Sequence, residues 1–172
     1  MTQAPFGELA VGSEIPVLER ATGLHHWNRY AAVNHEFVDI HMDDDAGKAA
    51  GYPSAFGMGN LQWSFLHTLL RNWMGDNGRI VKLACQFRSA NVKGQVVTAH
   101  GKITGVREDG GETLVDLEIW TDNDSGQLMA PGTATVALPA GALPAGALPA
   151  AALPAGALPA GALPAGALPK GA

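Results

Sequence analysis

Apolar residues in the first half of the chain recur with the spacing of helices. Within residues 24–33 they fall on one side, which predicts an amphipathic helix, and Thr22 is placed to cap its N-terminus. Three aspartates at 43–45 precede a short stretch at 46–50, and carboxylates favour the N-terminal turn of a helix. A second, shorter helix is therefore expected at 46–50.

The segment 57–73 predicts the central helix of the domain. Its leucines and aromatic residues cover more than one face, and a helix that is apolar on most sides is a buried one. Gly75 and the Asp-Asn-Gly at 76–78 provide its C-terminal stop. We expect Trp63 and Trp73 to lie in the core or at a subunit contact, where large aromatic side chains bury the most apolar area.

Beyond residue 80 the pattern changes to an alternation with period two, which is typical of strands with one buried face. The clearest run places on one face Val81, Leu83, Cys85 and Phe87. Further strands are expected at 95–106, 115–119 and 134–136, with an irregular edge strand within 8–19. One buried helix followed by mostly antiparallel strands is an α+β arrangement, in which a curved sheet wraps around the helix.

A low-complexity segment follows the last predicted strand. From Ala137 onward the chain repeats Ala-Leu-Pro, so that leucine recurs every five residues, a period of neither helix nor strand. Proline removes amide donors, and alanine and glycine offer too little apolar bulk for a core. We therefore expect one folded domain at 1–137 and a flexible tail at 138–172, with a weakly adhesive segment as the alternative interpretation.

The composition limits the classes of partner and compartment. Acidic side chains outnumber basic ones by 16 to 11, which argues against a nucleic-acid surface. Cys85 is the single cysteine, so no internal disulfide can form and a reducing compartment fits. The N-terminal residues lack a basic and then apolar leader, and no long apolar run suggests a membrane segment. These features predict a cytoplasmic protein that is not anchored to a membrane.

The candidate chemistry lies in the loop predicted at 34–42 and at the start of the central helix. Glu36 and His41 stand five positions apart, a spacing that lets a carboxylate and an imidazole converge on one water about 3 Å from each. Gly57 begins the predicted helix, and unsatisfied amides at a helix N-terminus suit a developing oxyanion. On these residues alone, ordinary loop positions are the simpler interpretation.

The same segment resembles the MaoC-like enoyl-thioester hydratases. Their pattern has a Tyr, then Gly-Asp-Phe-Asn-Pro-Ile-His-x-Asp, an Ala, a Gly-x-Pro turn and a His-Gly-Met that opens the central helix. The residues that match it in order and spacing are Tyr30, Phe37, Ile40, His41, Asp43, Ala46, Gly51, Pro53, Gly57 and Met58. The resemblance implies the hot-dog fold, an antiparallel sheet wrapped around a long central helix.

The resemblance also implies roles for individual residues. His41 and Glu36 would be the catalytic pair, and the amide of Gly57 would bind the thioester carbonyl. Asp39 stands where the family has proline and adds a second carboxylate near His41, which could orient or replace the acid, so it is a candidate for substrate binding. Glu36 replaces the family's aspartate and is one methylene longer.

Two further departures concern the surroundings of this pair. Val38 replaces an asparagine that helps to hold the loop, and Phe56 replaces the histidine before Gly57. These changes leave open a co-catalytic or non-catalytic role, in which another chain of a heteromer supplies the catalytic pair.

The activity implied by the resemblance is reversible hydration of a 2-enoyl thioester to a 3-hydroxyacyl thioester. It needs no metal and no bound cofactor, because coenzyme A or an acyl carrier protein arrives with the substrate. A hot-dog thioesterase is the less favoured enzyme, since many of these carry an acidic residue on the central helix and the segment 57–73 has none. The apolar surface of so small a domain further predicts a homodimer or a heteromer with another hot-dog subunit.

Overall fold

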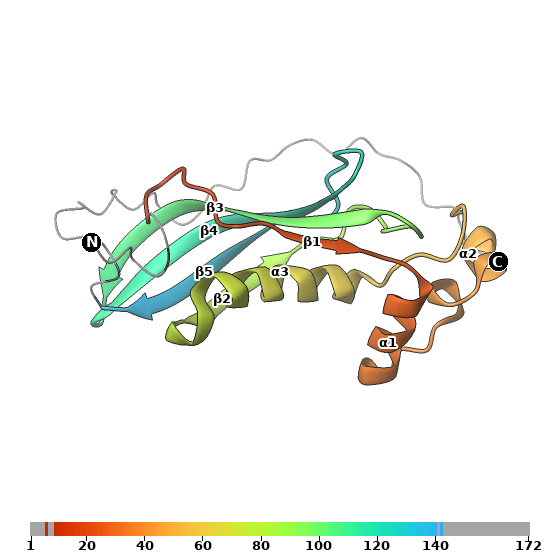
Figure 1. Ribbon diagram of the computed structural model, residues 1–172, viewed down its shortest axis with the longest axis horizontal. Coiled ribbons are helices and arrows are strands. Elements are labelled where there is room, and N and C mark those ends of the chain that lie inside the picture. The colour runs from red at the N-terminus through yellow and green to blue at the C-terminus, as the bar shows by residue number, and fades with distance from the viewer. Residues whose placement is uncertain (1–5, 7–8, 141, 143–172) are drawn as a thin grey trace.

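A five-stranded antiparallel sheet curves over one long helix in the computed structural model, which describes residues 6, 9–140 and 142 (Figure 1). The strands, in the spatial order β1-β3-β4-β5-β2, are β1 (Leu18–Ala21), β2 (Arg79–Cys85), β3 (Val96–Asp109), β4 (Glu112–Asn123) and β5 (Gly132–Pro139). The helices are α1 (Leu24–Asn34), α2 (Asp44–Ala49) and α3 (Gly59–Met74), with 3-10 turns η1 (Asp39–His41) and η2 (Gly75–Asn77). The α+β hot-dog architecture predicted from the sequence is confirmed.

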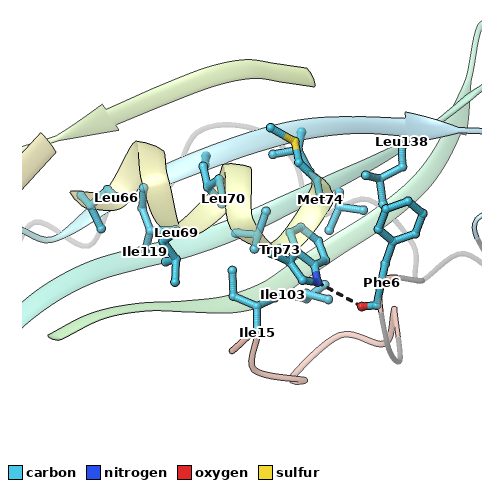
Figure 2. Packing of buried hydrophobic residues seen from close by; sticks show 14 of the residues in the cluster. Phe6, Ile15, Leu66, Leu69, Leu70, Trp73, Met74, Ile103, Ile119 and Leu138 are labelled. Carbon is cyan, nitrogen blue, oxygen red and sulfur yellow. Dashed lines mark hydrogen bonds between the residues drawn. The ribbon is translucent and has the colours of Figure 1, made fainter. Parts of the chain in front are cut away.

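The main core lies between α3 and the concave face of the sheet. Leu66, Leu69 and Leu70 of α3 are fully buried against residues of β3 and β4 that include Ile103 and Ile119 (Figure 2). Removing each such side chain from water contributes roughly 1.5–3 kcal/mol, so this contact holds the helix in place. At the far end of α3, the Trp73 indole donates a hydrogen bond of 3.0 Å to the Phe6 carbonyl.

A smaller cluster lies at the other end of α3, where α1 and α2 are found (Figure 1). Its buried members are Trp27, Ala31, Ala55, Met58 and Leu61. Trp27 and Ala31 lie one helical turn apart on α1, as the apolar spacing of 24–33 predicts. This cluster fixes α1 against the N-terminal turn of α3, and therefore positions the loop between α1 and α2.

The residues expected at the N-termini of α1 and α2 have different outcomes. Asp43 caps α2, because its carboxylate accepts from the amides of Asp45 and Ala46 at 2.9 and 2.8 Å. The prediction for Thr22 is wrong: Gly23 is the N-cap of α1 without a side-chain hydrogen bond. The pairing of β1 with β3 brings Thr22 beside Gln95, and its hydroxyl donates to that carbonyl at 2.9 Å instead.

The predicted strand at 81–87 exists, but its buried face is not the expected one. Val81 and Phe87 are about half exposed, whereas Leu83 and Cys85 are partly buried. The register of β2 against β5 shifts between Ile80 and Lys82, and such an irregularity breaks strict alternation. β2 also pairs on one side only, since it is an edge strand. The other predicted edge strand, within 8–19, is largely irregular, and β1 begins only at Leu18.

The last strand extends beyond the domain boundary expected at residue 137. Leu138 is 1 % exposed within the main core, and Pro139 ends β5 opposite Glu112. The first copy of the Ala-Leu-Pro repeat is therefore part of the sheet. The prediction of a flexible tail concerns residues that lie almost entirely outside the described part of the chain.

No helix in the described ranges, 6, 9–140 and 142, has the length and apolar character needed to cross a membrane.

Candidate functional site

His41 lies in η1, and hydrogen bonds to the chain that leads into α3 hold it in place. Its side chain is largely buried, with 8 % of the residue exposed. Nδ1 lies 2.8 Å from the carbonyl oxygen of Phe56, and the Phe56 amide donates to the Ile40 carbonyl at 3.2 Å. A carbonyl can only accept, so Nδ1 carries a proton and Nε2 is the free acceptor of the neutral ring.

The approach to α3 places two glycines near this imidazole. Gly57 donates its amide to the Asn91 carbonyl at 2.7 Å, so this amide does not point outward unsatisfied, as the sequence suggested. A Cβ atom at Gly57 would lie 2.9 Å from Trp27 Nε1 and 3.0 Å from Asn91 Oδ1, which explains the need for glycine. The role expected of the Gly57 amide therefore requires a different donor.

The open amides belong to the first turn of α3 itself. α3 begins at Gly59, two residues later than predicted, and its N-cap Met58 makes no side-chain cap. Within the described ranges, no acceptor is hydrogen-bonded to the amides of Gly59 and Asn60. Such amides carry the positive end of the helix dipole and favour a partial negative charge.

His41 and the N-terminal turn of α3 line the same small pocket, of about 260 Å³. Its walls are formed by His41, Tyr52, Phe56, Gly57, Gly59, Gln62, Phe87, Arg88, Ser89 and Ala90. The Phe56 ring stands edge-on to His41 at 5.2 Å and lies 4.0 Å from the Tyr52 ring. His41 and Gly59, the latter with an open backbone amide, thus line the pocket together with three aromatic side chains and several polar residues, a mixture typical of small-molecule sites.

Gln62 is a residue of α3 that holds the pocket segment at 88–90 against this helix. It is buried, and its amide nitrogen donates to the Ser89 carbonyl at 3.1 Å. Its Oε1 accepts from the Thr121 hydroxyl of β4 at 2.8 Å. A buried carboxamide with both ends paired is a rigid tie, so residues 88–90 are held at a fixed distance from α3.

The two candidate acids lie outside the pocket lining. Glu36 is partly buried and Asp39 is exposed, and neither borders the pocket with His41. The αL conformation of His35, with φ 55°, ends α1, and Glu36 donates its amide to the Ala31 carbonyl. The structure thus brings His41 and Gly57 together in the pocket lining, whereas Glu36, on the preceding loop, and Asp39, at the start of η1, lie outside it.

An ion pair ties this loop region to the segment before β3. Lys93 Nζ lies 2.6 Å from the Asp44 carboxylate, and Ala55 donates its amide to the same group at 3.2 Å. The Lys93 ammonium, with help from this amide, lowers the pKa of Asp44. Residues 49 positions apart in the sequence are thereby joined.

A larger cavity, of about 770 Å³, lies elsewhere, between the N-terminal segment at 13–18 and the later turns of α3. It is bordered by Leu69, Asn72 and Trp73 on the helix and holds neither His41 nor an open helix terminus. Size alone would favour it, but the chemistry favours the smaller pocket. In the part of the chain that the structure describes, no group of three His, Cys, Asp or Glu side chains could hold a metal ion.

Solved structures of other proteins share this fold. The (R)-hydratase of A. caviae involved in PHA biosynthesis superposes with a TM-score of 0.70 and 25 % sequence identity, over 76 % of this chain and 98 % of that one. This chain is a structural match to the MaoC-like (R)-hydratases and dehydratases. This match and the hot-dog fold confirm the resemblance that the sequence predicted.

Two other solved structures show the same fold at lower identity. The ChsH1-ChsH2 complex from Mycobacterium tuberculosis matches with a TM-score of 0.66 and 19 % identity, over 75 % of this chain and 98 % of that chain. The MaoC-like dehydratase from Rhodospirillum rubrum matches with a TM-score of 0.67 and 15 % identity, over 77 % and 94 %. No protein-family model and no curated protein sequence matches the chain.

Several pocket residues could not be singled out from the sequence. Tyr52 comes from a turn, and Phe87 and Ser89 come from the segment after β2, where local periodicity gives no indication of a shared site. Gln62 did carry a signal, because it is a neutral polar residue within a helix that is apolar on most sides. Its two hydrogen bonds explain why it is tolerated there.

Proposed function

We propose that this chain catalyses the reversible hydration of 2-enoyl thioesters to 3-hydroxyacyl thioesters. The observation that carries the proposal is the pairing of His41 Nδ1 with the Phe56 carbonyl. This hydrogen bond leaves Nε2 as a proton acceptor in a pocket that also contains the open N-terminal turn of α3. The structural match to the A. caviae (R)-hydratase supports the same reaction class.

In the proposed reaction, His41 Nε2 accepts a proton from a water molecule as its oxygen bonds to C3 of the enoyl group. The electron pair of the C2–C3 double bond then moves toward the thioester carbonyl, and C2 takes up a proton from the protonated imidazole or from an acid. The Gly59 amide takes the oxyanion role expected of Gly57, because Gly57 is already paired with Asn91. One such donor contributes about 3 kcal/mol to transition-state stabilisation.

Glu36, on the loop that leads to His41, is the acid of the pair in this proposal. The loop carries the exposed side chains of Phe37 and Val38. Burial of these two apolar side chains against substrate or a second subunit is favourable. Asp39, two residues from His41, is the alternative acid. The carrier is coenzyme A or an acyl carrier protein.

The test is the loss of the enoyl-thioester absorbance band after purified chain is added to crotonyl-CoA. Product analysis should show 3-hydroxybutyryl-CoA, and the reverse reaction should restore the band. Release of free coenzyme A without loss of the double bond would instead indicate a thioesterase and refute the proposal.

A second candidate role is that of a co-catalytic subunit. The position of Glu36 outside the pocket lining favours it, and the ChsH1-ChsH2 complex is a similar structure built from two different chains. Trp63 on α3 is 41 % exposed, which supports a subunit contact on that side. Under this alternative the purified chain is inactive on every enoyl thioester alone and active only with its partner, whereas a homodimer is active by itself.

A further inference from the structure

The phenyl ring of Phe87 lies directly over the first residue of α3. A Cβ atom built on Gly59 would be 2.7 Å from Phe87 Cδ2 and 2.9 Å from Cε2. Real Cβ atoms do not approach this closely, so the ring occupies the space that any other residue at position 59 would need. Both residues line the pocket that contains His41.

The backbone on either side of Phe87 is held by hydrogen bonds, whereas its side chain is half exposed. Gln86 donates its amide to the Pro131 carbonyl at 2.9 Å, and Arg88 donates to the Met129 carbonyl at 2.8 Å. Phe87 itself is 50 % exposed. A half-exposed ring on a fixed backbone changes its position by rotation about χ1 and χ2, a motion of picoseconds to nanoseconds for exposed side chains.

The size of the pocket makes the position of this ring decisive. About 260 Å³ is available with the ring in place, slightly below the roughly 300–1,000 Å³ of typical ligand pockets. A short acyl group next to the thioester fits such a space, whereas each added methylene needs more room. The neighbouring backbone does not supply it, because Gln62 ties the segment at 88–90 to α3.

We propose that Phe87 is the residue that limits acyl-chain length in this pocket, by packing against Gly59. The inference rests on the proposed function, since it takes an acyl thioester as the ligand. With the ring over Gly59 the pocket accepts short acyl groups, and longer chains bind only at the cost of displacing the ring from that contact.

Two variants test this role from opposite sides. Phe87→Ala removes the ring, and Gly59→Ala keeps the backbone amide but forces the ring aside. Each should raise kcat/KM for octenoyl-CoA relative to crotonyl-CoA by about tenfold or more, the scale on which pocket contacts discriminate between chain lengths. Val81→Ala is the matched control, because Val81 is an equally exposed apolar residue of β2 outside the pocket lining.

Binding of saturated thioesters separates this inference from the proposed function. Calorimetry with butyryl-CoA and octanoyl-CoA needs no turnover, and Phe87→Ala should tighten octanoyl-CoA relative to butyryl-CoA by about tenfold. If Phe87→Ala shows this shift in affinity but the wild-type chain does not hydrate enoyl thioesters, the limit on acyl-chain length is supported and the proposed reaction is refuted. Hydration by the wild-type chain with an unchanged length preference in both variants would overturn the role of Phe87 alone. Failure of both thioesters to bind would overturn both.

Discussion

The Nδ1 atom of His41 lies 2.8 Å from the carbonyl oxygen of Phe56, and this contact decides which ring nitrogen can react. The partner is a backbone group, so the tautomer does not depend on the ionisation of a neighbouring side chain. Phe56 stands where the MaoC-like pattern has histidine, yet the contact uses only its carbonyl. The substitution therefore leaves the orientation of His41 intact and makes the pocket wall more apolar.

Replacing His41 should abolish hydration without unfolding the domain. His41→Ala removes the proposed base, and general acid–base catalysis contributes typically 10²–10⁴-fold, so kcat should fall by at least about 100-fold. Steady-state rates with crotonyl-CoA measure this. His67→Ala is the control, since His67 is a partly buried histidine of α3 outside the pocket lining. Turnover within twofold of wild type in His41→Ala would remove this residue from the mechanism.

Isosteric amides should identify the acid. Glu36→Gln and Asp39→Asn each remove a carboxylate with little change of shape, and neither side chain is buried in the core. We expect Glu36→Gln to lower kcat by about 100-fold or more, as for loss of a general acid, and Asp39→Asn to have a small effect. A large effect in Asp39→Asn alone would exchange the two roles. Full activity in both variants would favour an acid supplied by a second subunit.

Gly47 of α2 should be intolerant of any side chain. A Cβ atom there would overlap the Ser54 carbonyl oxygen, so Gly47→Ala must separate α2 from the chain that leads to Ala55. Overpacking of this kind costs about 1–3 kcal/mol in the free energy of unfolding. Denaturant titration measures it. Gly23→Ala, where a Cβ atom meets nothing within 4 Å, should cost clearly less.

Leu138 should behave as a core residue although it belongs to the repeat. Leu138→Ala is expected to lower the free energy of unfolding by about 2–5 kcal/mol, the usual cost of truncating a buried leucine.

A chain ended after Ala142 should keep the melting temperature and the activity of the full chain, because the described core is complete at that point. Thermal unfolding of both proteins tests this, and a large loss on truncation would assign the tail a structural role.

The contact between Asp44 and Lys93 should contribute to acid sensitivity. Lys93 lowers the pKa of Asp44 in the folded state, so its contribution to stability is present above the unfolded-state pKa and is lost as pH falls through the folded value. Asp44→Asn should therefore reduce the difference between melting temperatures at neutral and acidic pH. The pair is partly exposed, so the effect is small and weakens with added salt. An unchanged pH profile would show that the pair adds nothing.

Local sequence patterns were sufficient for the main helices and strands, though not for all of their ends, and for one side of the site. Features that depend on residues close in sequence can be read from local patterns. They include the spacing of Trp27 and Ala31, the aspartates at the start of α2, and the alternation along β3 and β4. The matching segment around His41 also predicted a resemblance to the MaoC-like hydratases, and the structural match confirms their hot-dog fold.

Tertiary structure decided the remaining features, because they depend on contacts between distant residues. The Gly57 amide is engaged by Asn91, and the Phe87 ring covers Gly59, through strand register and helix packing that no local pattern encodes. The exposure of Val81 follows from the edge position of β2, and the burial of Leu138 follows from its pairing in β5. In each case the chemical type of a residue was readable from the sequence, whereas its partner was set by the folded chain.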